Sequence, residues 1–274
     1  MDMPDLSLIM PCYNEEGGAG VTARRLVRAF RQAGLRLELV AVDNGSHDRT
    51  GEVLGRIAAD LPEVITHRVE INEGYGNGVL QGIPLTHADW VGSIPADGQV
   101  DAEDVVRLFE TAAATDGKVI AKVRRRFRMD GLHRTLVSVA YNSYFRLLWP
   151  RIYSLDVNGS PKLMPRRYLL AMRLESKGWC LDPEIMVKAH LMGLRVHELN
   201  AFARQRESGA SHVRAATLWE FFVTLLGMRF SRQAAEWKRE LAGAAADSEL
   251  ERQPVTDSEA AHAGSSGSLT EGGE

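Results

Sequence analysis

An apolar run, Trp90 to Ile94, ends abruptly in a short polar segment that carries Asp97, Gln99 and Asp101. The pattern predicts a buried strand that delivers a carboxylate to its carboxyl end, with an oxygen-bearing side chain two residues later. Oxygen ligands placed in this way suit a hard divalent cation, and such a cation can bind a diphosphate at the edge of a sheet. The segment therefore predicts nucleotide chemistry.

Three further polar loops follow predicted strands. They span Asn14 to Glu16, Asp43 to Thr50, and the glycine-rich stretch Asn72 to Gly78. An aspartate at position 43 can accept hydrogen bonds from a nucleobase or a ribose. Turns and helix caps explain any one of these loops better than a ligand site does. Four such loops at the same edge of a sheet favour a shared ligand site.

The glycine spacing excludes one familiar class of nucleotide-binding protein. Gly74, Gly76 and Gly78 read G-x-G-x-G and follow the third predicted strand. The dinucleotide-binding fingerprint is G-x-G-x-x-G and follows the first strand. A Rossmann dehydrogenase is therefore disfavoured.

The loops require strands and helices that alternate along the chain. The predicted strands are residues 6–11, 37–42, 64–69, 90–96, 118–123, 160–164 and 195–202. The predicted helices are residues 21–32, 50–60, 76–85, 102–114, 131–155, 183–192 and 215–241. This order predicts an α/β fold with a mostly parallel central sheet flanked by helices on both faces.

Composition limits the class of protein further. The 274 residues are 45% hydrophobic, enough for a substantial core. The net charge is -3, and residues 243–274 carry -6, which leaves +3 on residues 1–242. That mild excess fits an anionic substrate and disfavours a nucleic-acid binder. Cys12 and Cys180 form no C-x-x-C motif, and no apolar stretch approaches the roughly 18 residues of a membrane span. We expect a cytoplasmic protein, soluble or peripheral at the inner face of the membrane.

Three motifs in order resemble one enzyme family. They are P-C-Y-N-E at 11–15, D-N-G-S-H-D-R-T at 43–50 and N-E-G-Y-G-N-G-V at 72–79. They are similar to P-x-Y-N-E, D-D/N-G-S-x-D-x-T and N-x-G-x-G-x-A of the inverting family 2 glycosyltransferases, specifically the dolichyl- or polyprenyl-phosphate sugar synthases with the GT-A fold. The resemblance covers most of residues 5–213. It implies that a nucleotide sugar, UDP- or GDP-linked, is bound by Pro11, Tyr13, Asn14, Glu15, Asp43, Asn44, Gly74, Gly78, Asp97 and Ser211.

The metal motif of that family, D-A-D-L-Q, aligns with Pro95 to Gln99. By resemblance, Asp97 and Gln99 would coordinate Mg2+ or Mn2+. Pro95 replaces the first aspartate, which leaves fewer anionic contacts near the sugar nucleotide. The alternative, that Asp97 only caps the next helix, competes with Asp101, which already supplies a cap.

Two later segments complete the implied catalytic set. W-C-L-D-P-E at 179–184 resembles the late acidic segment of the family, so Asp182 and Glu184 would face the reacting centre or orient the acceptor. An ordinary helix start before Pro183 explains Asp182 equally well. R-Q-R-E-S-G-A-S-H at 204–212 is similar to R-x-x-G-x-S-K, so Arg206 would neutralise the diphosphate, and His212 replaces the lysine. The implied catalytic residues are Asp97, Asp182, Glu184 and Arg206.

Basic residues mark the implied acceptor site. Lys162 lies in the place of the acceptor loop of the family, and Lys122, Arg124 and Arg126 follow the fifth strand. Alternation along an extended segment would turn these last three side chains to one side, where they can bind an acceptor phosphate. A solvated run of charge is the commoner explanation of such a cluster.

Two helices and a tail lie beyond the motifs. The predicted helix 131–155 has Leu136, Val139, Ala140, Ser143 and Leu147 on one face, and Pro150 ends or kinks it. An apolar stripe that includes Phe222 and Leu225 marks the last helix, and it either packs on the core or lies in a membrane interface. We divide the chain into a transferase domain (1–213), an amphipathic helix (214–242) and a disordered acidic tail (243–274).

These observations predict an inverting transfer of a sugar from a nucleotide diphosphate to an acceptor, most simply a polyprenyl phosphate. A hydroxyl acceptor is the alternative, and it would require Asp182 or Glu184 as a base. A catalytically silent sugar-nucleotide-binding regulator is a second alternative, suggested by Pro95 and His212. A nucleotidyltransferase is disfavoured, because its first loop is normally glycine-rich and basic, whereas this one is acidic.

Overall fold

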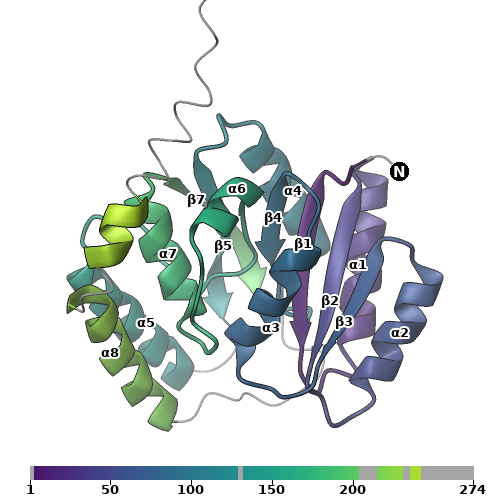
Figure 1. Cartoon of the computed structure of the whole chain (residues 1–274), viewed down its shortest axis with the longest axis horizontal. Coiled ribbons are helices and arrows are strands. Elements are labelled where there is room, and N and C mark those ends of the chain that lie inside the picture. The colour runs from purple at the N-terminus through teal and green to yellow at the C-terminus, as the bar shows by residue number, and fades with distance from the viewer. Residues whose placement is uncertain (1–2, 129–131, 204–214, 231–234, 242–274) are drawn as a thin grey trace, which may run out of the picture.

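The structure, a computed structural model, describes residues 3–128, 132–203, 215–230 and 235–241 (Figure 1). Seven strands within these residues form one sheet in the order β3-β2-β1-β4-β6-β5-β7. They are β1 (Leu6–Cys12), β2 (Leu37–Asn44), β3 (Val64–Val69), β4 (Trp90–Ser93), β5 (Val119–Arg128), β6 (Lys162–Pro165) and β7 (Arg195–Ala203). Only β6 runs antiparallel to its neighbours among these strands. The predicted mostly parallel sheet is confirmed.

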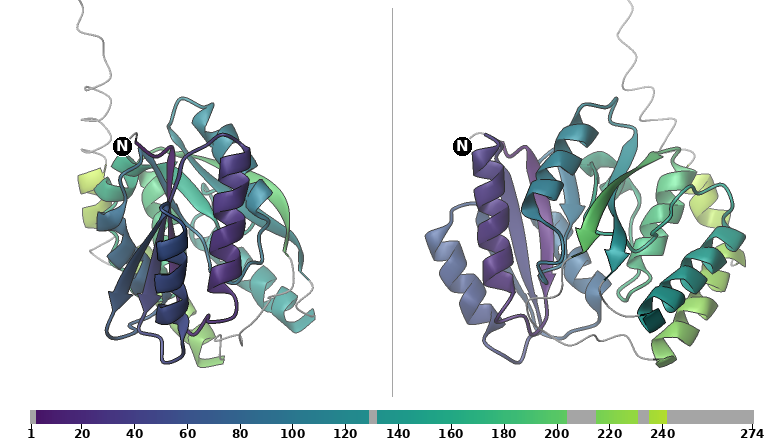
Figure 2. Two further views of the ribbon diagram at one scale, coloured as in Figure 1. Left: turned by 90° about the vertical axis from the view of Figure 1, so that its right-hand side faces the viewer. Right: turned by 180° about the vertical axis from the view of Figure 1, so that it is seen from behind.

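Helices cover both faces of the sheet (Figure 2). They are α1 (Ala19–Gln32), α2 (Thr50–Asp60), α3 (Tyr75–Gly82), α4 (Ala102–Ala113), α5 (Leu132–Leu148), α6 (Arg166–Ala171), α7 (Leu181–Leu191) and α8 (Ala215–Phe230), with a 3-10 turn at Ile83–Leu85. Two hydrophobic cores result, one with α1, α2 and α4 and the other with α3 and α5 to α8. Along β1, Leu8 and Met10 face the first core and Ile9 the second. The strand is apolar throughout because both of its faces are covered.

The long helix α5 differs from its prediction in length and in its buried face. It ends at Leu148, two residues before Pro150, because a proline lacks the amide hydrogen that a helix needs. Val139 and Leu147, predicted to share the buried face, are exposed, whereas Tyr141 and Phe145 are buried. The buried face is therefore turned away from the one that the apolar pattern predicted.

The predicted C-terminal helix, residues 215–241, is described in two parts. Residues 215–230 form α8 and residues 235–241 are helical, while residues 231–234 lie outside the described residues. Leu225 and Met228 of α8, together with Trp237 and Leu241, are buried in the second core. None of the described helices is both long enough and apolar enough to cross a bilayer.

Candidate active site

The loops after β1 and β2 are joined by hydrogen bonds. The amide of Asn14 donates to Ser46 Oγ (3.1 Å), and Asn14 Oδ1 accepts from the amide of His47 (2.9 Å). The amide of Glu15 donates to Thr50 Oγ1 (2.8 Å), and the ring of Tyr13 lies edge-on to that of His47. Asn14 has a φ of 54°, a left-handed conformation that asparagine tolerates better than most residues. The first two predicted loops therefore form one surface.

Asp43 is fixed at the carboxyl end of β2. Its carboxylate accepts from the amide of Ser46 (3.0 Å) and pairs with Arg68 Nη1 (3.1 Å) on β3. A Cβ atom on Gly51 would lie 2.7 Å from Asp43 Oδ2, so only glycine fits beside the carboxylate. Asp43 is buried, while the Arg68 side chain is 59% exposed. Sequence reasoning missed Arg68, since nothing near it in sequence marks it as a partner of Asp43.

The glycine-rich loop approaches the same edge. Asn44 Nδ2 donates to the carbonyl of Gly74 (2.9 Å). A Cβ atom on Gly78 would lie 2.8 Å from Pro11 Cβ and 3.1 Å from Asn44 Cγ. Asn44 Oδ1 is buried and has no hydrogen-bond partner among the described residues. Pro11, Asn44, Gly74 and Gly78 therefore converge around one buried polar atom that has no hydrogen-bond partner among the described residues.

Asp97 occupies a tight turn after β4. Its Oδ1 accepts from the amide of Gln99 (3.2 Å), and Gly98 between them has a φ of 65°. Thr22 of α1 donates to the carbonyl of Ala96 (2.8 Å), which attaches this turn to the first part of α1. The residue at the N-cap of α4 is Asp101, so Asp97 is not the helix cap.

The chemistry around Asp97 fits one kind of metal site. No group of three or more His, Cys, Asp or Glu side chains able to hold a metal ion occurs among the described residues. Asp97 and Gln99 supply one carboxylate and one amide, both nearly buried. Mg2+ is commonly held by one or two carboxylates and by substrate phosphates. This donor set therefore fits a cation that takes most of its ligands from a diphosphate.

Tyr75 lies between the donor loops and the predicted acceptor side. Its side chain lies near Ser93 at the end of β4 and near Ser160 before β6. Burial raises the pKa of Tyr75, and the carboxylates of Asp182 and Asp97 raise it further, so the phenol stays protonated. The ring stacks on Trp179, with centroids 5.5 Å apart and planes 7° apart. Tyr75 and Trp179 were not singled out from the sequence as individual residues, although each lies within a segment that was.

Two of the predicted acceptor-binding lysines are buried. Lys162 Nζ lies 2.5 Å from Asp182 Oδ1. Lys122 contacts Ser154 Oγ (3.3 Å), Glu198 Oε1 (3.3 Å) and the carbonyl of Asp156. Internal carboxylates and hydroxyls surround both ammonium groups, so neither lies at an exposed surface. Their predicted role in acceptor binding stays a prediction.

The remaining predicted residues fall into three groups. Arg124 on β5 is half-buried, and a register shift between Arg125 and Phe127 breaks the alternation on which the prediction for Arg126 depends. The side chain of Arg126 lies outside the described residues, as do Arg206 and Ser211. Glu184 is fully buried in α7, where it binds backbone amides and Lys188, so its predicted place at the reacting centre is wrong.

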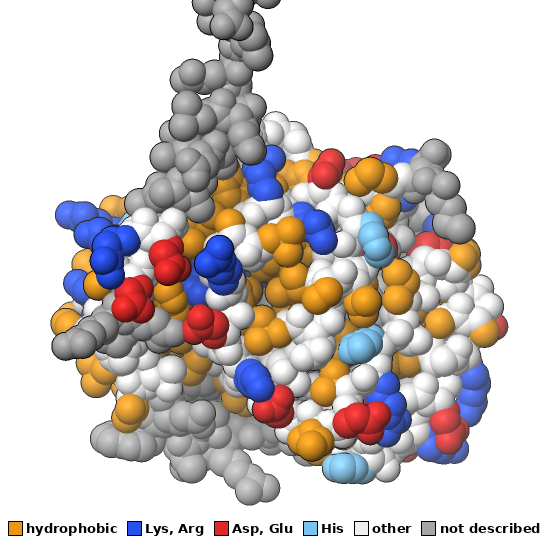
Figure 3. All heavy atoms as spheres, viewed as in Figure 1, with side chains coloured by type: hydrophobic (Ala, Val, Ile, Leu, Met, Phe, Trp, Pro, Cys, Tyr) orange, Lys and Arg blue, Asp and Glu red, His pale blue; other side chains and the backbone are white. Residues whose placement is uncertain are grey.

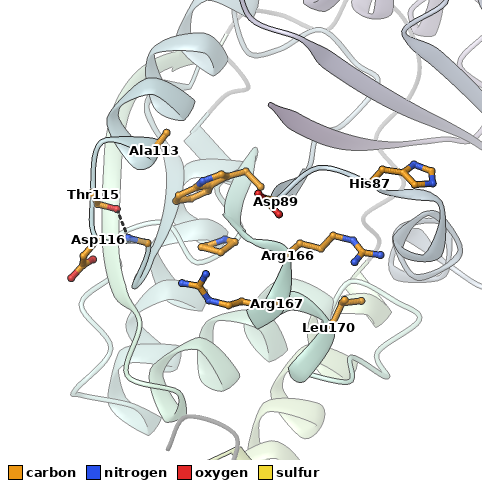
Figure 4. Close-up of a pocket in the computed structure, with 11 residues that line it drawn as sticks. His87, Asp89, Ala113, Thr115, Asp116, Arg166, Arg167 and Leu170 are labelled. Carbon is orange, nitrogen blue, oxygen red and sulfur yellow. Dashed lines mark hydrogen bonds between the residues drawn. The ribbon is translucent and has the colours of Figure 1, made fainter. Parts of the chain in front are cut away.

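A cavity of about 570 Å³ lies elsewhere (Figure 4). Its lining includes Trp90 at the start of β4 and Pro165 at the end of the antiparallel β6, so it opens at the amino ends of the parallel strands. Figure 4 shows Arg166 and Arg167 extending in opposite directions from the start of α6. None of the predicted site residues lines this cavity, which is separate from the loops described above.

Comparison with known protein sequences identifies the family of this chain. Residues 7–170 match the family described as Glycosyl transferase family 2. The undecaprenyl-phosphate 4-deoxy-4-formamido-L-arabinose transferase of Pectobacterium carotovorum is 35% identical over 214 residues, which cover 77% of this chain and 63% of that protein. The dolichyl-phosphate beta-glucosyltransferase of Trichomonas vaginalis is 24% identical over 85% of this chain and 75% of that protein. The chain thus spans less than two thirds of the length of the first of these relatives.

Solved structures show the same fold. Glucosyl-3-phosphoglycerate synthase from Mycobacterium tuberculosis, in complex with Mn2+, UDP-glucose and phosphoglyceric acid, superposes with a TM-score of 0.65 at 17% identity. The superposition covers 82% of this chain and 79% of that one. A second complex of the same enzyme, with phosphoglyceric acid, gives a TM-score of 0.66 at 18% identity, over 82% of this chain and 80% of that one.

Fold and loop geometry together define the GT-A class of nucleotide-diphospho-sugar transferases. Within that class, the chain belongs to glycosyl transferase family 2. The predicted fold and the predicted family are both confirmed.

Proposed function

We propose that this protein transfers a sugar from a UDP- or GDP-sugar to a polyprenyl phosphate with inversion at the anomeric carbon. One observation carries the proposal: the loops after β1 and β2 and the glycine-rich loop converge around the unpartnered Asn44 Oδ1, next to the Asp97 turn. Two relatives named for transfer to undecaprenyl or dolichyl phosphate support the acceptor class.

The donor would lie across this edge of the sheet. Asp43 would accept hydrogen bonds from the base or ribose, and Asn44 would lie beside it in the donor site. Asp97 and Gln99 would hold Mg2+ or Mn2+ against the diphosphate. The cation would neutralise charge on the leaving group. Arg206, outside the described residues, would add a second positive charge there.

The acceptor phosphate would attack from the opposite side of the sugar. One phosphate oxygen forms the new bond to the anomeric carbon, and the bond from that carbon to the diphosphate oxygen breaks with its electron pair. A phosphate oxygen is already anionic near neutral pH, so this step needs no strong base. Asp182 is paired with Lys162, so taking a proton from a hydroxyl acceptor would break that buried pair, which supports phosphate as the acceptor.

A transfer assay tests the proposal. Purified protein with Mn2+ or Mg2+ is given a panel of UDP- and GDP-sugars, with undecaprenyl or dolichyl phosphate in one arm and soluble hydroxyl acceptors in another. We expect a lipid-linked product whose anomeric configuration, read by NMR, is inverted relative to the donor. Transfer to hydroxyl acceptors alone, or a retained configuration, would contradict the proposal. Tight donor binding by calorimetry without any turnover would support the silent regulator.

We also infer contact with the inner face of a membrane, at the surface of α5 and α8. Leu147 on α5, Tyr153 in the segment after α5 and Phe230 on α8 are more than 70% exposed, and Arg146 and Arg229 of the two helices are exposed as well. Figure 3 shows hydrophobic side chains along this edge, and residues 132–155 contain no acid. Apolar and basic side chains together suit an anionic bilayer. Sedimentation with phosphatidylglycerol vesicles, but not with phosphatidylcholine vesicles, is the expected result, and no sedimentation with either would contradict it.

A further inference from the structure

A buried ion pair in α7 holds the loop that precedes that helix. Glu184 Oε1 and Lys188 Nζ lie 2.7 Å apart, and both side chains are almost fully buried. The Glu184 carboxylate accepts from the amides of Glu175 (3.0 Å) and Ser176 (2.8 Å). Lys188 donates to the carbonyl of Arg173 (3.0 Å). One turn of helix thus binds the loop 173–179 at several backbone positions.

The ring of Trp237 closes this pair from solvent. Lys188 Nζ lies 4.1 Å from the centroid of that ring, and Trp237 is itself buried. Desolvation strengthens the attraction between an ammonium and an aromatic face. Charged groups that are buried, paired and hydrogen-bonded in this way hold one geometry firmly, because losing any contact leaves a charge without compensation.

The loop 173–179 in turn supports the first turn of α3. The carbonyl of Lys177 accepts from the amide of Asn77 (2.8 Å). A Cβ atom on Gly74 would lie 2.6 Å from that carbonyl oxygen, and one on Gly76 would overlap the carbonyl oxygen of Ser176. No side chain caps α3, so a backbone carbonyl of the loop accepts a hydrogen bond from the first turn of the helix instead. The two glycines permit this close approach.

Tyr75 lies between those two glycines. Its position follows from the loop, because its ring stacks on Trp179, the last residue of the loop. Its hydroxyl lies near Ser93 and Ser160 and near the carboxylates of Asp97 and Asp182. The contacts therefore run without a break from Glu184 through the loop to the proposed reacting centre.

We propose that Glu184 is a positioning residue for sugar transfer, which acts through the loop 173–179 to hold the Tyr75 hydroxyl between the Asp97 and Asp182 sides of the site. This inference rests on the proposed function. Glu184 touches neither donor nor acceptor. Its effect should therefore appear mainly in the turnover number, and less in the Michaelis constant for the donor, because most of the predicted donor contacts lie outside the glycine-rich loop that residues 173–179 support.

A double-mutant cycle tests it in the full-length protein. Tyr75→Phe removes the hydroxyl and keeps the stacked ring, and Glu184→Gln keeps the size of the side chain and removes its charge. We expect each change to lower kcat about tenfold, the equivalent of roughly one hydrogen bond, with the donor KM changed less than about threefold. The double variant should have a kcat close to that of the slower single variant, because both changes disturb one unit. Losses in kcat that multiply would overturn the inference.

Two controls separate positioning from loss of fold. Glu110→Gln, on the exposed side of α4, should leave kcat unchanged. If Glu184→Gln does not fold, Gly76→Ala replaces it in the cycle, since it disturbs the same contact from the α3 side. Gly55→Ala in α2, where nothing lies within 4 Å of the new Cβ, is its matched control.

Amide hydrogen exchange separates this inference from the proposed function. Glu184→Gln should speed exchange at Glu175, Ser176 and Asn77, whereas Glu110→Gln should not. Unchanged exchange at Asn77 would overturn the inference whether or not sugar transfer is observed. A wild-type protein that transfers no sugar, but shows the expected change in exchange, would overturn the proposed function alone.

Discussion

Lys122 and Lys162 lie directly opposite each other on the antiparallel strands β5 and β6, and neither side chain reaches solvent. Each has its own carboxylate, Glu198 for Lys122 and Asp182 for Lys162. Two buried ammonium groups on adjacent strands repel each other unless such partners are present. The carboxylates therefore offset the repulsion between the two ammonium groups and allow both lysines to be buried in adjacent strands.

The first prediction concerns the pH dependence of stability. Burial, together with the charge of Lys162, lowers the pKa of Lys122 from 10.5 to about 8. The folded chain therefore releases this proton at a lower pH than the unfolded chain. Below about pH 8, Lys122 is charged in both states, and burying its charge lowers the free energy of unfolding. This loss of stability disappears as the pH rises from about 8 to 10.5, because the folded chain then holds Lys122 neutral.

Urea denaturation at pH 7.5 to 10 measures the effect. Relative to Lys122→Met, the wild type should gain stability as the pH rises, by up to about 3 kcal/mol. The exposed Lys238→Met variant should show a constant difference from wild type across this range. A constant difference for Lys122→Met as well would show that its ammonium is not desolvated.

The second prediction concerns the Lys162–Asp182 pair. Removing one partner leaves a buried charge unpaired, so Asp182→Asn or Lys162→Met should each cost about 3 to 5 kcal/mol of unfolding free energy. Replacing both, as Lys162→Met with Asp182→Leu, should recover much of that loss without restoring sugar transfer. Chemical denaturation and the transfer assay together measure this.

An exposed pair serves as the control for the second prediction. Arg24 and Asp60 lie 2.7 Å apart with both side chains more than half exposed. Their coupling energy should be at most about 1 kcal/mol. A coupling of the same size for Lys162 and Asp182 would mean that burial adds nothing to that pair.

The third prediction concerns the close contact at Gly78. Because a Cβ atom there meets Pro11 and Asn44, Gly78→Ala should displace the Asn44 side chain and raise the donor KM about five- to tenfold. Gly55→Ala, where nothing lies within 4 Å, should leave the donor KM unchanged and stabilise α2 by about 0.5 to 1 kcal/mol. Equal donor KM values for the two variants would remove Gly78 from the donor site.

Local signals predicted much of the framework. The bounds of α2 (Thr50–Asp60) and β3 (Val64–Val69) were predicted to the residue. The meeting of the loops was also predictable, since parallel strands bring their carboxyl ends to one edge. The donor contacts of individual residues stay predictions, because the structure shows that the loops converge but contains no donor.

Features that depend on distant partners were not predictable. The buried face of α5 includes Asn142, whose side-chain amide donates to the carbonyl of Ser138 and accepts from the amide of Val157. A pattern of apolar residues cannot predict that a polar residue of this kind is buried. Lys122 reads as part of a solvated charge run until Glu198, 76 residues away, is placed beside it. Glu184 binds backbone amides, which no side-chain motif reveals.

The fourth prediction concerns Arg124, two residues beyond Lys122 on the same face of β5. It is half-buried, so its charge is less screened than that of a fully exposed residue. Arg124→Gln should raise the KM for polyprenyl phosphate about fivefold, with a smaller change in the donor KM. Arg56→Gln on the exposed side of α2 is the control. A larger effect on the donor KM would assign Arg124 to the diphosphate instead.

The last prediction concerns Asp97. Asparagine at this position can still accept the hydrogen bond from the amide of Gln99, so Asp97→Asn should fold normally, but it lacks the charge that a divalent cation requires. By calorimetry, the variant should bind a UDP- or GDP-sugar in the presence of Mn2+ no better than the wild type does in EDTA. Asp101→Asn, at the N-cap of α4, should keep the Mn2+-dependent affinity and so exclude an effect on that helix.

Pro95→Asp provides the reciprocal test, because it restores a second carboxylate two residues before Asp97 and should tighten Mn2+-dependent binding about tenfold. Metal-dependent affinity that survives in Asp97→Asn and does not respond to Pro95→Asp would place the cation elsewhere.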